Sequence, residues 1–144
     1  MYSRILVTLE HTPTDEHILA HVRKLAQYCH ASLVLIHVAD GWAARYSESL
    51  TLRESEEMRE DRDYLERRRA ELAAAGLTVD AVLASGDPAS EIAAAAEREK
   101  VDLIAMATHG HGFVNDLVRG SVANAVRHKS KIPVLMVREE KKGG

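Results

Sequence analysis

The sequence predicts an α/β domain in which a five-stranded parallel sheet, ordered 3-2-1-4-5, carries helices on both faces. Two observations predict this class. Short apolar runs alternate with longer segments of helical period, and the apolar runs are continuous, as is typical of strands buried on both faces. Because 144 residues suit one domain, we expect a single domain over 1–144 that ends in a charged tail at 139–144.

Five apolar runs are the expected strands, each bounded by polar, glycine or proline residues. They are Arg4–Leu9, Ser32–Val38, Leu77–Ala84, Val101–Ala107 and Pro133–Val137. Asp80 interrupts the third run, which indicates a strand near an edge of the sheet.

Local signals mark the ends of the helices expected between these strands. Thr14 is the expected cap of the first helix, in which apolar residues recur at helical spacing as far as Cys29. Asp87 is the expected N-cap of the third helix, with Pro88 at the first helical position. The fourth helix is expected from about Ser121 to His128.

The second expected helix, at about 50–75, is densely charged and stops at Gly76. Its apolar residues form a narrow seam with a spacing of seven, at Met58, Leu65 and Leu72. This pattern indicates a solvated helix that lies on the sheet by one stripe; the alternative is a helix that pairs with a coiled-coil partner.

Composition excludes several classes of protein. With 19 basic and 22 acidic residues the net charge is −3, so we expect no nucleic-acid partner. Cys29 is the single cysteine, which excludes an intrachain disulfide and indicates a reducing compartment. The chain has no signal peptide pattern and no apolar stretch of about 18 residues, so we expect a cytoplasmic protein without a membrane segment.

The expected strand order places a crevice at the carboxyl ends of strands 1 and 4, where the connections diverge. The fourth strand runs into a glycine loop containing Gly110, and Gly120-Ser121 is expected to open the next helix. Glycine loops and helix N-termini direct backbone N–H groups at phosphates, so this segment is either a phosphate cradle or a set of turns.

At this point the sequence resembles the universal stress protein (UspA-like) family over essentially the whole chain. The resemblance is carried by the ILV strand, SLVLIHV, ATHGHGFVNDLVRGSVANAVRH and the closing PVLMV. The family's nucleotide signature, G-x2-G-x9-G-[S/T], is met at Gly110 and at Gly120-Ser121, whereas Ala107 replaces the first glycine. The resemblance implies a flavodoxin-like domain that binds ATP or AMP, with or without Mg²⁺, and serves stress tolerance without strong catalysis.

The resemblance also assigns residues to the ligand. It places the phosphates against Gly110, Gly120, Ser121 and the backbone of Val122. It lines the adenine and ribose side with Thr8, Leu9, Glu10, Val38, Met106 and Ala107. Glu10 replaces the family's frequent aspartate and adds a methylene, and Ala107 adds a methyl group. We expect Ala107 to continue the strand with an ordinary φ, so that nucleotide binding is retained.

The eight histidines prompt a test for metal or acid–base chemistry. His17 and His21 share a helix face, but the sequence supplies no third ligand, so we expect no metal site. His109 and His111 flank the loop glycine, where a charged imidazole would favour phosphate. His37 is expected to be a packed residue near the crevice.

Strong catalysis is not expected, because the glycine loop lacks a Walker lysine and no serine lies in a nucleophile elbow. The leading hypothesis is a nucleotide-binding regulatory module. The alternatives are an interaction protein of the same fold that binds no nucleotide, and a slow ATPase that uses Arg119 or a loop histidine. Pro133–Val137 would be an exposed apolar edge strand, so we expect a homodimer through it.

Overall fold

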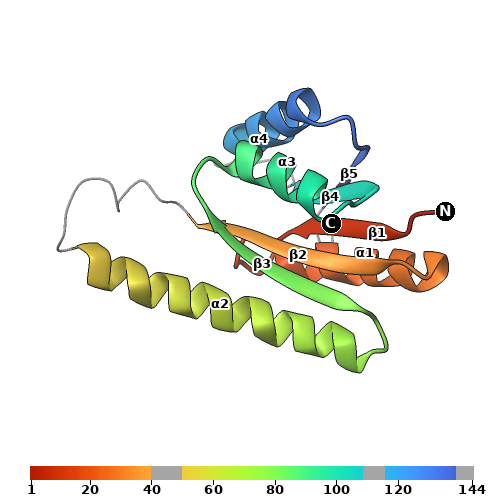
Figure 1. Ribbon diagram of the computed structural model, residues 1–144, viewed down its shortest axis with the longest axis horizontal. Helices are drawn as coiled ribbons and strands as arrows, with labels where there is room; N and C mark the ends of the chain where they lie inside the picture. Colours follow the sequence, from red (N-terminus) through yellow and green to blue (C-terminus); the bar gives the residue numbers. More distant parts are fainter. Residues whose placement is uncertain (40–49, 109–115, 139–144) are drawn as a thin grey trace, which may run out of the picture.

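The computed structural model describes residues 1–39, 50–108 and 116–138, with the backbone alone described at 50–55 and 116–120. Strands and helices alternate along this part of the chain (Figure 1). The strands are β1 (Arg4–Thr8), β2 (Ser32–Ala39), β3 (Val79–Ser85), β4 (Leu103–Thr108) and β5 (Val134–Arg138). The helices are α1 (Asp15–Cys29), α2 (Leu50–Ala74), α3 (Pro88–Arg98) and α4 (Asp116–Lys129).

The sheet has the predicted order, β3-β2-β1-β4-β5, and the pairs are all parallel. β1 lies in the centre, where Val7 is in register with Leu35 of β2 and with Ala105 of β4. The α/β class, the strand order and the edge position of β3 are therefore confirmed. β1 and β4 are the neighbours at which the chain reverses its winding direction.

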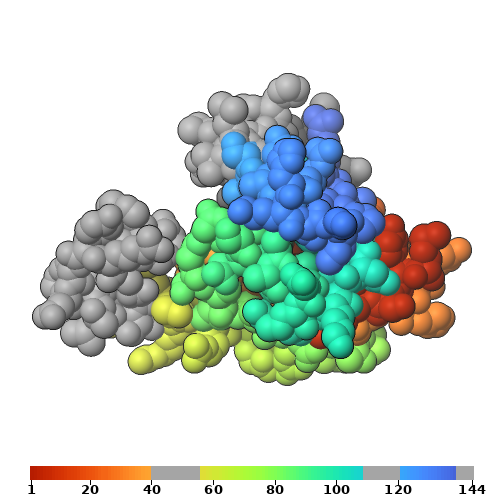
Figure 2. All heavy atoms as spheres, turned by 45° about the horizontal axis from the view of Figure 1, so that its top comes forward, coloured from red at the N-terminus to blue at the C-terminus, as the bar shows by residue number. Residues whose placement is uncertain are grey.

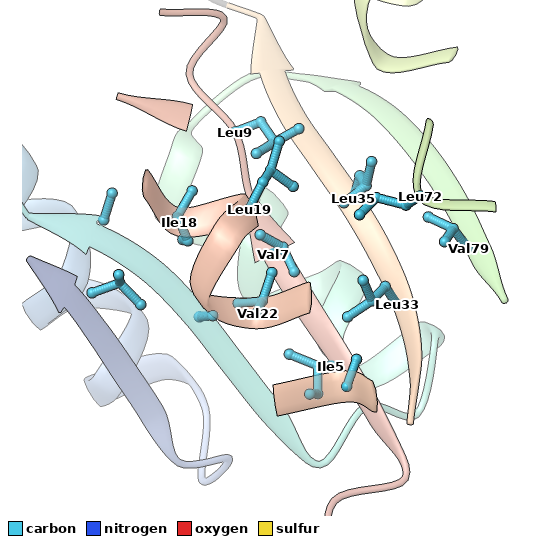
Figure 3. Packing of buried hydrophobic residues seen from close by; sticks show 14 of the residues in the cluster. Ile5, Val7, Leu9, Ile18, Leu19, Val22, Leu33, Leu35, Leu72 and Val79 are labelled. Atoms are coloured by element: carbon cyan, nitrogen blue, oxygen red, sulfur yellow. The ribbon is translucent and has the colours of Figure 1, made fainter. Parts of the chain in front are cut away.

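Successive strand residues pack on opposite faces of the sheet, which produces two cores. Ile5 and Val7 pack with α1 and α2 in the first core (Figure 3), whereas Leu6 packs with α3 and α4 in the second. α3 and α4 pack against each other and lie side by side in Figure 2. The inner strands β1, β2 and β4 are buried on both faces over most of their length, and this explains why their sequences are continuously apolar.

The expected seam of α2 faces the sheet. Leu65 and Leu72 are buried in the first core beside Leu35 and Val79, while Met58 is half-buried. α2 therefore packs on its own sheet by one stripe, as the first interpretation of the seam predicts. Tyr64, adjacent to the seam, is also buried and was not predicted.

Several predicted helix ends are confirmed, whereas two need correction. Asp87 caps α3 by accepting a hydrogen bond from the Ser90 N–H at 2.9 Å, and Gly76 follows α2 with φ of +96°. Thr14 is the N-cap residue of α1, but its side chain makes no capping hydrogen bond. The Asp15 carboxylate, in the first turn, accepts hydrogen bonds from N–H groups that precede the helix.

The predicted start of α4 is wrong, because the helix begins at Asp116 and includes Gly120 and Ser121. The prediction treated Gly120 as a helix boundary. One glycine inside a helix costs only about 1 kcal/mol relative to alanine, which a helix of 14 residues tolerates. Gly120-Ser121 thus lies in the second turn rather than at the helix N-terminus.

Among residues 1–39, 50–108 and 116–138, no helix is long and apolar enough to cross a membrane. The predicted tail at 139–144 lies outside the described residues. The cytoplasmic location and the lack of a nucleic-acid partner stay predictions.

Candidate functional site

A cavity of about 410 Å³ opens at the carboxyl ends of the central strands, where the strand order predicts a ligand crevice. The ends of β1 and β2, one residue of β4 and parts of α3 and α4 form its walls. Its lining residues are Thr8, Leu9, Glu10, Ile36, His37, Val38, Pro88, Ile92, Met106 and Val122. Aliphatic and thioether groups dominate, and Thr8, Glu10 and His37 add polar groups.

Six of the residues predicted for the site meet in this cavity. They are Thr8, Leu9, Glu10, Val38, Met106 and Val122. Ser121 is exposed on α4 and Ala107 lies in β4, and neither belongs to the lining. Gly110 lies outside the described residues, as do the loop histidines His109 and His111. Gly120 is within α4 and only its backbone is described.

Ala107 continues β4 in register with Val137, and its φ is not positive. The predicted strand geometry at this position is therefore confirmed. Its methyl group packs in the first core with Leu9 and Ile18, while the neighbouring Met106 packs in the second core and lines the cavity. The methyl that replaces the family's glycine hydrogen consequently points away from the face that holds the cavity.

The wall that α3 contributes through Pro88 and Ile92 was not predicted. Pro88 was assigned only to the first position of its helix. The signal available in the sequence was the strand order itself, because a right-handed crossover from β3 to β4 carries α3 across the face that holds Ile36 and Met106. His37 lies near the crevice, as predicted, and lines it.

The segment after β1 forms the rim of the cavity, and buried Asp15 holds it. The Asp15 carboxylate accepts hydrogen bonds from the N–H groups of Glu10 and His11, both at 2.9 Å. The Leu9 N–H donates to the Ile36 carbonyl at 2.8 Å, so this segment continues along β2. His11 adopts a left-handed backbone with φ of 61°. The turn at His11 directs the N–H groups of Glu10 and His11 at the Asp15 carboxylate.

Tyr64 of α2 completes the hydrogen bonds around Asp15, which is 1% exposed. The Tyr64 hydroxyl donates to Asp15 Oδ2 at 2.6 Å and accepts from Arg68 Nε at 3.3 Å. Arg68 also forms ion pairs with Glu16 and Glu71. Burial raises the pKa of the Asp15 carboxyl above its ordinary value, in opposition to these hydrogen bonds and to nearby Arg68. Burial, and then the bond to Asp15, raises the pKa of Tyr64 to about 12.

A second contact joins α2 to the cavity through Asp61. Its carboxylate lies 2.7 Å from His11 Nδ1 and 3.4 Å from His37 Nε2. His37 Nδ1 donates to the Leu9 carbonyl at 2.9 Å. The His11 ring stacks on Tyr64, with centroids 4.0 Å apart. Two carboxylates thus connect the rim of the cavity to α2. Asp15 of α1 contacts Tyr64 of α2, and Asp61 of α2 contacts His11 of the rim.

Within the described ranges, no group of three His, Cys, Asp or Glu side chains is arranged to hold a metal ion. His17 and His21 lie on α1, as predicted, and His21 is exposed. The apolar walls of the cavity suit the apolar part of a small organic ligand, and the polar groups of Thr8, Glu10 and His37 can orient such a ligand.

The strand order and the position of the cavity define a flavodoxin-like α/β domain. The sequence pattern of the Universal stress protein family matches residues 1–138, so the chain belongs to this family. It is 29% identical over 157 aligned residues to Universal stress protein MJ0577 of Methanocaldococcus jannaschii, with 97% of each chain covered. The solved structure of MJ0577 matches with a TM-score of 0.85 at 30% identity, over 99% of both chains.

Two more distant structures carry nucleotides. One is a universal stress protein in complex with cAMP, and the other is the universal stress protein from Archaeoglobus fulgidus in complex with dAMP. Each has a TM-score of 0.69 at 19% identity; the matches cover 95% and 94% of this chain and 97% and 98% of theirs. At this identity they show a shared fold.

Proposed function

We propose that the cavity binds an adenine nucleotide, ATP or AMP, with or without Mg²⁺, and that the chain is a nucleotide-binding stress-response module. The observation that carries the proposal is the cavity of about 410 Å³ at the switch point between β1 and β4. Its volume and apolar walls suit a small organic ligand. Distant relatives in complex with cAMP and dAMP support an adenine nucleotide as that ligand.

In the proposed complex the base lies among Val38, Ile92 and Met106, which come from three different elements. Thr8, Leu9 and Glu10 face the base and ribose, together with the backbone of Ala107. The phosphates lie toward Gly110, Gly120, Ser121 and Val122. Val122 lines the cavity from α4, and this position supports the placement of the phosphates near this part of the helix.

Calorimetric titration of nucleotide-stripped protein with ATP, AMP and GTP tests the proposal. We expect saturable heat with the adenine nucleotides and weaker binding of GTP. Gly120→Val should abolish binding because it adds bulk at the phosphate side. Asn124→Val, which introduces the same side chain at an exposed position of α4, should bind normally. Absence of heat and of a thermal shift with every nucleotide would reject the function and favour an interaction protein without a ligand.

We also propose that the chain forms a homodimer through β5. β5 is an edge strand of the sheet, and Met136 on it is 38% exposed. Unpaired apolar edges are covered in native proteins, and a second copy covers this one most simply. Light scattering should give the mass of a dimer for the unaltered chain and of a monomer for Met136→Lys. A monomer at micromolar concentration without the substitution would reject the interface.

A further inference from the structure

Asp61 contacts two histidines that come from different parts of the chain. It belongs to α2, outside the cavity lining, whereas His37 lines the cavity from β2 and His11 follows β1. The side chains of Asp61 and His37 are 15% and 14% exposed, and that of His11 is 36% exposed. Water therefore screens the contact between Asp61 and His37 less than it screens a surface ion pair.

The two ring nitrogens of His37 face different partners. The Leu9 carbonyl can only accept a hydrogen bond, so His37 Nδ1 carries a proton. His37 Nε2 faces the Asp61 carboxylate, 3.4 Å away. His11 needs a proton on Nδ1, which its neutral ring or its imidazolium supplies.

Other charged and titratable groups lie near this contact. On the rim and α1 they are Glu10, Asp15 and Glu16; on α2 they are Tyr64, Arg67 and Arg68. Asp15 accepts from two rim amides and Tyr64, Glu16 is paired with Arg68, and Glu10 accepts from Thr12. Asp61 contacts both imidazoles.

We propose that Asp61 is a positioning residue for the nucleotide cavity. Its carboxylate holds His11 at the rim, and it holds His37 where the Nδ1 of that ring fixes the Leu9 carbonyl. This inference rests on the proposed nucleotide binding.

The test compares Asp61→Asn with the unaltered chain in calorimetric titrations of AMP. We expect Asp61→Asn to bind about tenfold more weakly, because it loses charge-assisted contacts with both imidazoles. Asp63→Asn, at an exposed position of the same helix, should match the unaltered chain.

A second variant separates positioning from general support of the fold. In His37→Asn the amide nitrogen takes the place of Nδ1 and can still donate to the Leu9 carbonyl, but the contact of Nε2 with Asp61 is lost. We expect Asp61→Asn to weaken AMP binding less in this background than in the unaltered chain, because only the contact with His11 remains to be removed. A loss of equal size in both backgrounds, or no loss in either, would overturn the inference.

Amide hydrogen exchange at Glu10 and His11 gives a readout without nucleotide. We expect faster exchange of both amides in Asp61→Asn than in Asp63→Asn, because the rim loses its connection to α2 through His11. If the unaltered chain binds no nucleotide, the proposed function fails while this exchange still decides whether Asp61 positions the rim. Unchanged exchange would overturn the inference.

Discussion

Tyr64→Phe removes one hydroxyl group from the contact between α2 and the rim of the cavity. The hydroxyl donates to Asp15 at 2.6 Å and accepts from Arg68 at 3.3 Å. The ring remains, so the stacking on His11 and the packing in the first core are retained. The substitution therefore isolates the hydrogen bonds of one buried oxygen.

The expected loss of stability follows from the burial of Asp15. A hydrogen bond to a charged group contributes roughly 1.5–3 kcal/mol, and a carboxylate that is 1% exposed cannot replace the hydroxyl with bulk water. Asp15 keeps its two amide donors, which limits the loss. We expect unfolding free energy to fall by about 2 kcal/mol and Tm by about 6 °C.

The pH dependence of stability provides an independent measure. The pKa of Tyr64 is raised from 10.0 to about 12, so the folded state favours the protonated phenol. This contribution is complete below the unfolded pKa and is lost as pH rises toward the folded one. At about 1.4 kcal/mol per pKa unit, the unaltered chain should lose up to about 3 kcal/mol more than Tyr64→Phe does between pH 10 and 12.

Urea unfolding followed by circular dichroism measures both effects. Tyr28→Phe is the matched control, because Tyr28 is 87% exposed and its hydroxyl should contribute less than about 0.5 kcal/mol. The reasoning is refuted if Tyr64→Phe is as stable as Tyr28→Phe, or if its alkaline profile matches that of the unaltered chain.

Urea unfolding also checks three further substitutions. Asp87→Ala removes the cap on the Ser90 amide and should cost about 1 kcal/mol, whereas Asp87→Asn should restore most of it. Gly86→Ala should cost about 1–2 kcal/mol, because φ is +128° and the new Cβ would lie 3.1 Å from Glu91 Oε1. Leu35→Ala should cost about 2–5 kcal/mol, because Leu35 is fully buried in the first core.

Each of these substitutions has an outcome that contradicts its explanation. Equal stability of Asp87→Ala and Asp87→Asn would show that the cap contributes nothing. Gly76→Ala shares the positive φ, at +96°, but meets no atom within 4 Å, so it measures backbone strain alone. A neutral Gly86→Ala beside a costly Gly76→Ala would contradict the account of Gly86. A loss below about 1 kcal/mol in Leu35→Ala would mean that the core closes around the deletion.

Much of the fold and part of the site could be predicted from local sequence. Continuous apolar runs such as Ile5 to Val7 are the direct consequence of burial on both faces, so they predict central parallel strands. Given the strand order, the cavity falls at the ends of β1 and β4. The predicted lining residues Leu9 and Met106 do meet there. The start of α4 was misplaced, because Gly120 was given more weight as a helix breaker than its cost justifies.

The contacts between α2 and the rim could not be predicted, because they join residues about 50 positions apart. Tyr64 and Asp15 are separated by 49 residues, and Asp61 and His11 by 50. Neither contact has a local pattern. Each depends on how α2 is rotated against the sheet, since the face of α2 that lies inward decides which side chains meet the rim.

The sequence by itself determined the class of fold, the strand order and the edge of the sheet at which the cavity lies, because apolar periodicity reports burial directly. Only the tertiary structure decided that Asp61 meets the two histidines while Asp63 stays exposed. α2 is densely charged on several faces, and the sequence does not show which of its carboxylates point toward the sheet. Its contacts follow from the packing of Leu65 and Leu72 on the sheet, which fixes the rotation of the whole helix.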